Sequence, residues 1–125
     1  MHENPGKQVT PRVAVIIPAK DEAERIGMTV RAVKALPFVN LELIVVVDDG
    51  SVDDTREIAR QAGAVTVRHT VTRGKASSME TGAKVVAMRA IRGKTPPLLL
   101  FLDADLGESA AEAAPLIEPV VKGEA

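Results

Sequence analysis

The sequence predicts an α/β fold: a doubly wound layer structure with a mainly parallel sheet and helices on both faces. Apolar runs at 13–17, 43–47 and 98–102 have the length and composition of strands that are covered on both sides. Between these runs lie segments whose apolar residues recur at helical spacing. Strands that alternate with helices in this way form parallel sheets with right-handed crossovers, and we expect the strand order 3-2-1-4.

The elements follow one another with clear boundaries. A helix is predicted over 21–36, where a single apolar stripe is ended by Pro37. Residues 109–121 are expected to be helical, but Pro115 and Pro119 favour a short or bent element. The remaining predicted elements are a strand over 42–47, a helix over 54–62, a short strand over 64–68, a helix over 77–92 and a strand over 98–102.

The composition is that of one folded domain. The chain has 125 residues, 46% of them hydrophobic, and we expect a flexible N-terminal arm over 1–11 and one domain over 12–125. The 16 basic residues nearly balance the 17 acidic ones, and Phe38 and Phe101 are the only aromatic residues, so nucleic acid is not expected as a partner. No apolar run approaches the ~20 residues that span a bilayer. The absence of cysteine fits the cytoplasm.

Polar segments follow the carboxyl end of every predicted strand. Side chains after the second and fourth strands, on either side of the first, should lie roughly 10 Å apart, so that one nucleotide can bridge them. Three of the four segments are acidic. The segments are 18–22, 48–55, 73–75 and 103–105.

Asp103 and Asp105 are the candidate metal ligands. Two carboxylates so close together repel each other unless a cation neutralises them, and Mg²⁺ or Mn²⁺ takes few protein carboxylates and completes its shell with water and phosphate. The alternative is that both are solvated or helix-capping acids.

Other candidates have equally plain alternatives. Asp49 either belongs to a turn that caps a helix or accepts the imide N–H of a uracil. Arg73 and Lys75 form either a solvated basic loop or, with the helix N-terminus beside them, a diphosphate site. Glu22, with Lys20 and Asp21, either starts a helix or contacts the nucleotide. We expect His69 to be an ordinary surface or strand-end residue rather than a base.

Two common nucleotide-binding sites are excluded by their motifs. The first strand is not followed by G-x-G-x-x-G, and the chain contains no G-x-x-x-x-G-K-[ST], so neither a dinucleotide Rossmann site nor a P-loop is expected. Four ordered segments instead resemble family-2 glycosyltransferases, which have the Rossmann-like GT-A fold and include the dolichyl-phosphate mannosyltransferases and glucosyl-3-phosphoglycerate synthases. The resemblance covers about residues 12–107. The segments are 15–22, 46–55, 73–82 and 101–105.

The resemblance implies a function and a set of site residues. The function is binding of a UDP- or GDP-sugar through Mg²⁺ or Mn²⁺, with inverting transfer of the sugar to an acceptor. The implied nucleotide-sugar contacts are Pro18, Ala19, Glu22, Asp49, Lys75 and Asp103, and the implied metal ligands are Asp103 and Asp105 of a DXD motif.

The sequence also departs from the family. Asp21 stands where Asn is usual, and Ala76 where Gly is usual. The larger departure is truncation, because the family's catalytic base and acceptor-binding part are expected to lie beyond this sequence, and neither Glu108 nor Glu112 is a favoured replacement. The alternative function is therefore a non-catalytic module that binds a nucleotide sugar or a metal. Because truncation exposes the fourth strand as an apolar sheet edge, we also expect a homo-oligomer.

Overall fold

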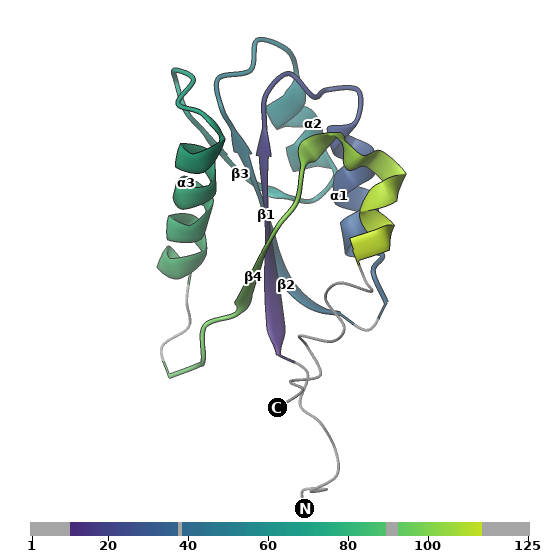
Figure 1. The fold of residues 1–125 in the computed structure, drawn as a ribbon, viewed down its shortest axis with the longest axis vertical. Helices are drawn as coiled ribbons and strands as arrows, with labels where there is room; N and C mark the ends of the chain where they lie inside the picture. The colour runs from purple at the N-terminus through teal and green to yellow at the C-terminus, as the bar shows by residue number, and fades with distance from the viewer. Residues whose placement is uncertain (1–10, 38, 90–92, 114–125) are drawn as a thin grey trace, which may run out of the picture.

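The computed structural model describes residues 11–37, 39–89 and 93–113 (Figure 1). Its strands form one parallel sheet in the order β3-β2-β1-β4, which confirms the predicted class and strand order. Residues 1–10 of the predicted arm lie outside the described residues. The elements are β1 (Arg12–Ala19), α1 (Ile26–Lys34), β2 (Asn40–Asp48), α2 (Thr55–Gln61), β3 (Val65–Arg68), α3 (Lys75–Met88), β4 (Leu98–Phe101) and the 3₁₀ segment η1 (Ala104–Ala113).

Strand β1 is buried on both faces, which explains its continuous apolar sequence. Val13, Val15 and Ile17 pack into the core beneath α1 and η1. Ala14 and Ile16 point the other way and pack with β2 and α3. Figure 1 shows the two layers, with α3 on one side of the sheet and α1, α2 and η1 on the other. Each fully buried Val or Ile contributes about 1.5–3 kcal/mol relative to an exposed one.

Helix α3 approaches the sheet most closely at Gly82. A Cβ atom at this position would overlap Ile16 and would lie 3.3 Å from Cγ2 of Val47. Gly82 is buried in the middle of the helix, where glycine is otherwise unfavourable. The close contact between helix and sheet therefore explains a residue that helix propensity alone disfavours.

We expect Gly82→Ala to destabilise the fold by about 1–3 kcal/mol, because the new methyl group overpacks the core between α3 and β1. Urea denaturation measures this change. Glu80→Ala, at an exposed position of the same helix, is the control for the effect of alanine on helix propensity. A Gly82→Ala variant that is more stable than the parent would show that the helix does not lie against Ile16.

Helix α1 begins later than predicted, at Ile26 rather than Asp21. Asp21 has φ 54°, a left-handed conformation that starts no helix, and its Oδ1 accepts the N–H of Val52 at 2.8 Å. The backbone N–H groups of residues 21–23 are already used by side chains from the segment 51–55, which includes the start of α2. The bonds run from Asp21 N to Ser51 Oγ (2.8 Å), from Glu22 N to Thr55 Oγ1 (2.8 Å) and from Ala23 N to Asp53 Oδ2 (3.2 Å).

The segment after β4 also differs from its prediction. Helical turns begin at Ala104, earlier than the expected residue 109, and are of the 3₁₀ type with a break at Gly107. Thr29 explains the early start, since its buried hydroxyl donates to the carbonyl of Ala104 and accepts the N–H of Gly107, both at 2.7 Å. Residues 114–121 of the predicted helix lie outside the described residues, as do the last residues, 90–92, of the helix predicted over 77–92.

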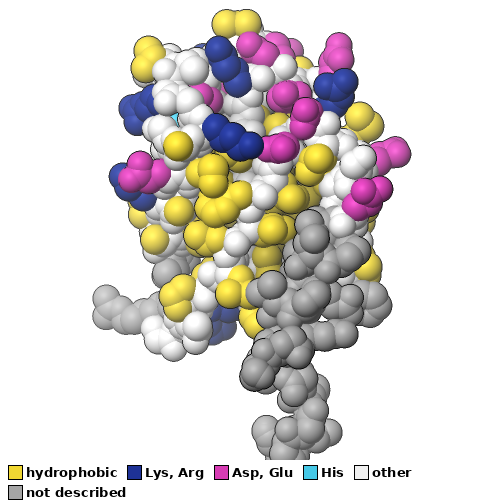
Figure 2. Space-filling view, in the orientation of Figure 1, with side chains coloured by type: hydrophobic (Ala, Val, Ile, Leu, Met, Phe, Trp, Pro, Cys, Tyr) yellow, Lys and Arg dark blue, Asp and Glu magenta, His cyan; other side chains and the backbone are white. Residues whose placement is uncertain are grey.

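Strand β4 forms an apolar edge of the described sheet. Leu98, Leu99 and Phe101 are 38–42% exposed, and Figure 2 shows an apolar surface across the middle of this face. Charged side chains gather above it, at the carboxyl end of the sheet. The described helices include none that is long and apolar enough to cross a membrane.

Candidate functional site

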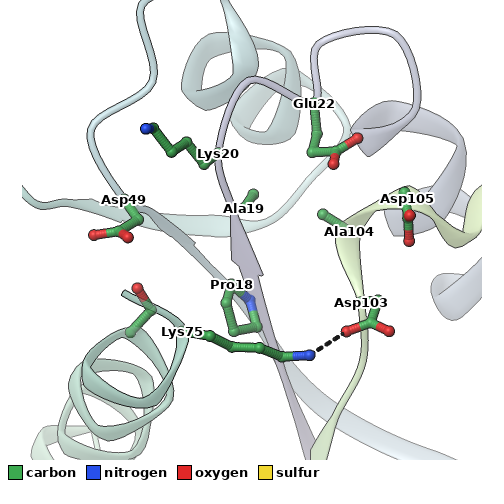
Figure 3. A pocket seen from close by; sticks show the side chains of 10 residues that line it. Pro18, Ala19, Lys20, Glu22, Asp49, Lys75, Asp103, Ala104 and Asp105 are labelled. Atoms are coloured by element: carbon green, nitrogen blue, oxygen red, sulfur yellow. Dashed lines mark hydrogen bonds and ion pairs between the residues drawn. The ribbon is translucent and has the colours of Figure 1, made fainter. Parts of the chain in front are cut away.

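One cavity lies at the carboxyl ends of β1, β2 and β4 (Figure 3). Its volume is about 260 Å³. Every nucleotide-sugar contact and metal ligand that the family resemblance implied lines it. The cavity lies next to the point where the order of the strands along the sheet reverses, between β1 and β4. The lining residues are Pro18, Ala19, Lys20, Glu22, Asp49, Lys75, Ser78, Asp103, Ala104 and Asp105.

Asp49 is buried at 6% exposure and is held by three donors. Its carboxylate accepts the N–H groups of Arg73 at 2.8 Å and Gly74 at 2.9 Å, and it contacts Nδ1 of His69 at 2.8 Å. Burial by itself raises the pKa of Asp49, but these hydrogen bonds outweigh it and hold the pKa below its ordinary value. Asp49 is therefore an ionised acceptor in a fixed orientation.

His69 follows β3, as predicted for a strand-end residue, but it is not on the surface. The side chain is only 4% exposed. Its Nδ1 contacts Asp49 and its Nε2 contacts Oγ1 of Thr81, each at 2.8 Å. The imidazole thus links Asp49, directly after β2, to α3. The sequence contained no signal for this contact, because Asp49 and Thr81 lie 20 and 12 residues away along the chain.

Lys75 faces Asp103 across the cavity. Figure 3 shows the Lys75 ammonium paired with Asp103 Oδ1, and the distance between them is 2.7 Å. Both side chains are more than half exposed. The pKa of Lys75 is raised mainly by the hydrogen bond to Asp103 and further by the negative charge of this carboxylate. The first residue of α3 therefore places a positive charge between the helix N-terminus and the acidic segment after β4.

Glu22 and Asp105 also line the cavity and add further negative charge to it. Burial raises the pKa of Glu22, and the charge of Asp105 raises it further. A cation bound here would relieve this repulsion. The described residues contain no group of three or more His, Asp or Glu side chains that could enclose a metal. Mg²⁺ and Mn²⁺ need fewer protein carboxylates than this, because they complete their shell with phosphate and water.

Two predicted candidates lie outside the cavity lining. The side chain of Asp21 holds the backbone of Val52, and Arg73 contributes its backbone N–H to Asp49. Two lining residues, Ser78 and Ala104, were not predicted. Helical spacing could have identified Ser78, which lies one turn after Lys75 on α3.

The sequence model described as glycosyl transferase family 2 matches residues 14–125. The chain belongs to this family. Among curated proteins, the family-2 chain is 33% identical over 109 residues to an uncharacterized protein of Methanocaldococcus jannaschii, covering 87% of this chain and 42% of that protein. It is 31% identical over 94 residues to glucosyl-3-phosphoglycerate synthase of Mycolicibacterium smegmatis, covering 75% of this chain and 31% of the synthase. The chain thus spans less than half the length of these relatives.

Solved structures agree with this assignment at the level of the fold. The family-2 chain superposes on glucosyl-3-phosphoglycerate synthase from Mycobacterium tuberculosis with a TM-score of 0.69 at 24% identity, covering 91% of this chain and 42% of the synthase. The same enzyme in complex with Mg²⁺ and UDP gives a TM-score of 0.68 at 24% identity, with 91% and 41% covered. The observed sheet is therefore the GT-A sheet of these neighbours.

Proposed function

We propose that this domain binds the nucleoside diphosphate of a sugar donor together with Mg²⁺ or Mn²⁺, in the cavity at the carboxyl end of the sheet. One observation carries the proposal: Pro18, Ala19, Glu22, Asp49, Lys75, Asp103 and Asp105 come from four separate segments and line a single cavity. The family to which the chain belongs supports a sugar nucleotide as ligand. So do the fold neighbours from M. tuberculosis, which were solved with UDP and either Mg²⁺ or Mn²⁺.

The charges along the cavity suggest how the donor lies. The base would occupy the end near Asp49, whose fixed carboxylate is suited to a ring N–H such as N3–H of uracil or N1–H of guanine. The diphosphate would lie by Lys75 and the N-terminus of α3, which both favour anions. Asp103 and Asp105 would hold the divalent ion against the diphosphate. When bound, this ion neutralises the charge that develops on the leaving group.

The proposal extends to glycosyl transfer with inversion, to an acceptor of unknown chemistry. The side chains of the cavity position the donor: Asp49 orients the base, and Lys75 opposes the charge of the diphosphate. We further propose that the protein acts in the cytoplasm and associates with itself through the apolar β4 edge. A monomer at micromolar concentration in sedimentation experiments would contradict this association.

Calorimetric titration with UDP, GDP and their sugars, with and without Mn²⁺, tests the proposed ligand. Nucleotide binding that requires the metal is the expected result, and a chain that binds none of these nucleotides has a different function. Assays of donor hydrolysis and of sugar transfer then separate an enzyme from a non-catalytic binding module. Transfer or hydrolysis supports the enzyme, whereas donor binding without either reaction supports the module.

Lys75→Gln is expected to change metal binding and nucleotide binding in opposite directions. Loss of the ammonium group frees Asp103, so Mn²⁺ alone should bind about two- to fivefold more tightly, a small change because exposed ion pairs contribute little. UDP should bind about tenfold more weakly, because a charged partner of the diphosphate is lost. Electron paramagnetic resonance of Mn²⁺ and calorimetry measure the two effects. Lys84→Gln, an exposed lysine of α3 outside the cavity, should change neither.

A further inference from the structure

Four residues of the loop that leads into α3 contact Asp49, the residue directly after β2. His69 Nδ1 and the N–H groups of Arg73 and Gly74 contact the carboxylate of Asp49. The hydroxyl of Thr72 donates to the Asp49 carbonyl at 3.0 Å. Every one of these groups lies within residues 69–74, directly before Lys75. The orientation of Asp49 and the path of this loop are therefore fixed by the same contacts.

The contact with Asp49 specifies that Nδ1 of His69 carries a hydrogen. Asp49 is an ionised carboxylate that only accepts, so the ring nitrogen that faces it, Nδ1, has to carry a hydrogen. In a neutral imidazole the other nitrogen, Nε2, is then an acceptor, and it lies 2.8 Å from the hydroxyl of Thr81, which can donate. The chain Thr81–His69–Asp49 is thus satisfied by the neutral ring in its Nδ1–H form. The ring itself does not line the cavity.

The geometry leaves one part of the Asp49 carboxylate for a ligand. Oδ1 is contacted by two donors, His69 Nδ1 and Arg73 N, whereas Oδ2 accepts from Gly74 N alone. Since Asp49 lines the cavity, Oδ2 can accept one more N–H. Uracil N3 and guanine N1 carry such a hydrogen. Cytosine N3 and adenine N1 carry a lone pair, which this carboxylate repels.

We propose that His69, as its neutral Nδ1–H tautomer held by Thr81, is a positioning residue that fixes Asp49 as an acceptor and thereby makes the cavity select nucleotides with an imide-type N–H. This inference rests on the proposed function, because it assigns a selectivity to the same cavity. His69 touches neither substrate nor metal in this role. It acts only through Asp49 and through the loop that Asp49 organises.

Long-range ¹H–¹⁵N correlation of the imidazole at neutral pH tests the tautomer without any ligand. The sequence has two histidines, His2 and His69, and the spectrum of His69→Asn assigns their signals. The expected pattern for His69 is that of a neutral ring protonated at Nδ1. A ring protonated at Nε2, or at both nitrogens, would overturn the inference even if the nucleotide binds as proposed.

Calorimetry with UDP and CDP tests the selectivity. The parent should prefer UDP by about 10- to 100-fold, the range expected for a hydrogen bond to a charged group. His69→Leu should reduce this preference to about threefold or less. His69→Asn should retain most of the preference for UDP, because the N–H of its amide can replace Nδ1–H. This variant keeps the test decisive if His69→Leu does not fold. Thr81→Val should fall between them, because it removes the hydroxyl that fixes the tautomer.

The outcomes separate the two proposals. A parent that binds neither UDP nor GDP contradicts the proposed function and, with it, the selectivity. If the parent prefers UDP and a folded His69→Leu variant keeps the full preference, the proposed function stands and the role of His69 is wrong. Equal binding of UDP and CDP by the parent also refutes the selectivity while leaving nucleotide binding intact.

Discussion

Replacing Asp103 and Asp105 together with Asn is expected to weaken metal-dependent UDP binding by about 100-fold or more. The two carboxylates are the acidic side chains of the cavity that follow β4, and neutral amides are poor ligands for a hard divalent ion. Even the loss of a residue that only hydrogen-bonds to a metal ligand typically lowers the metal affinity about 10- to 100-fold. Calorimetric titration of UDP in saturating Mn²⁺ measures the loss.

A matched control is available on the same segment. Glu108→Gln with Glu112→Gln also removes two negative charges, and both side chains are exposed and outside the cavity lining. This control variant should bind UDP and Mn²⁺ like the parent. Equal weakening in both double variants would show that net charge, rather than ligation by Asp103 and Asp105, governs binding.

Asp49→Ala is expected to destabilise the domain by about 3 kcal/mol. The substitution leaves the N–H groups of Arg73 and Gly74 and the buried imidazole of His69 without their acceptor, and a buried donor without a partner costs about 1–3 kcal/mol. Urea denaturation at neutral pH measures the change. Asp54→Ala is the control, because Asp54 is exposed and makes no side-chain bond as the N-cap of α2.

The destabilisation by Asp49→Ala should also depend on pH. Because the folded-state pKa of Asp49 lies below its ordinary value, the ionised carboxylate contributes stability above that ordinary pKa. This contribution is lost as the pH falls through the folded-state pKa. The difference in stability between parent and variant should therefore shrink in acid. A difference that stays constant down to strongly acidic pH would mean that the charge of Asp49 is not involved.

The fold was predictable because burial on two faces leaves a strong mark on a sequence. Residues 13–17 form a continuous apolar run, and the structure shows successive residues of β1 packing on opposite helical layers. The cavity was predictable for a related reason. Parallel strands bring their carboxyl ends to the same end of the sheet. Asp49 and Asp103 therefore had to lie on either side of β1 at that end.

The remaining features depend on contacts that no local pattern encodes. The start of α1 is set by side chains about 30 residues away, which take the N–H groups of the expected first turn. The burial of His69 depends on Asp49 and Thr81, and the early turn at Ala104 depends on Thr29. Such contacts join single residues of different elements and produce no periodicity. Only the assembled fold reveals them.

Paramagnetic broadening by Mn²⁺ tests most directly whether acidic residues at neighbouring strand ends hold a metal and a diphosphate together. With UDP present, substoichiometric Mn²⁺ should broaden the amide signals of Lys75, Ala104 and Asp105 first. The signals of Leu41 and Thr95, near the amino ends of the strands, should stay sharp. Broadening centred anywhere other than the cavity, or identical with and without UDP, would contradict the proposed site.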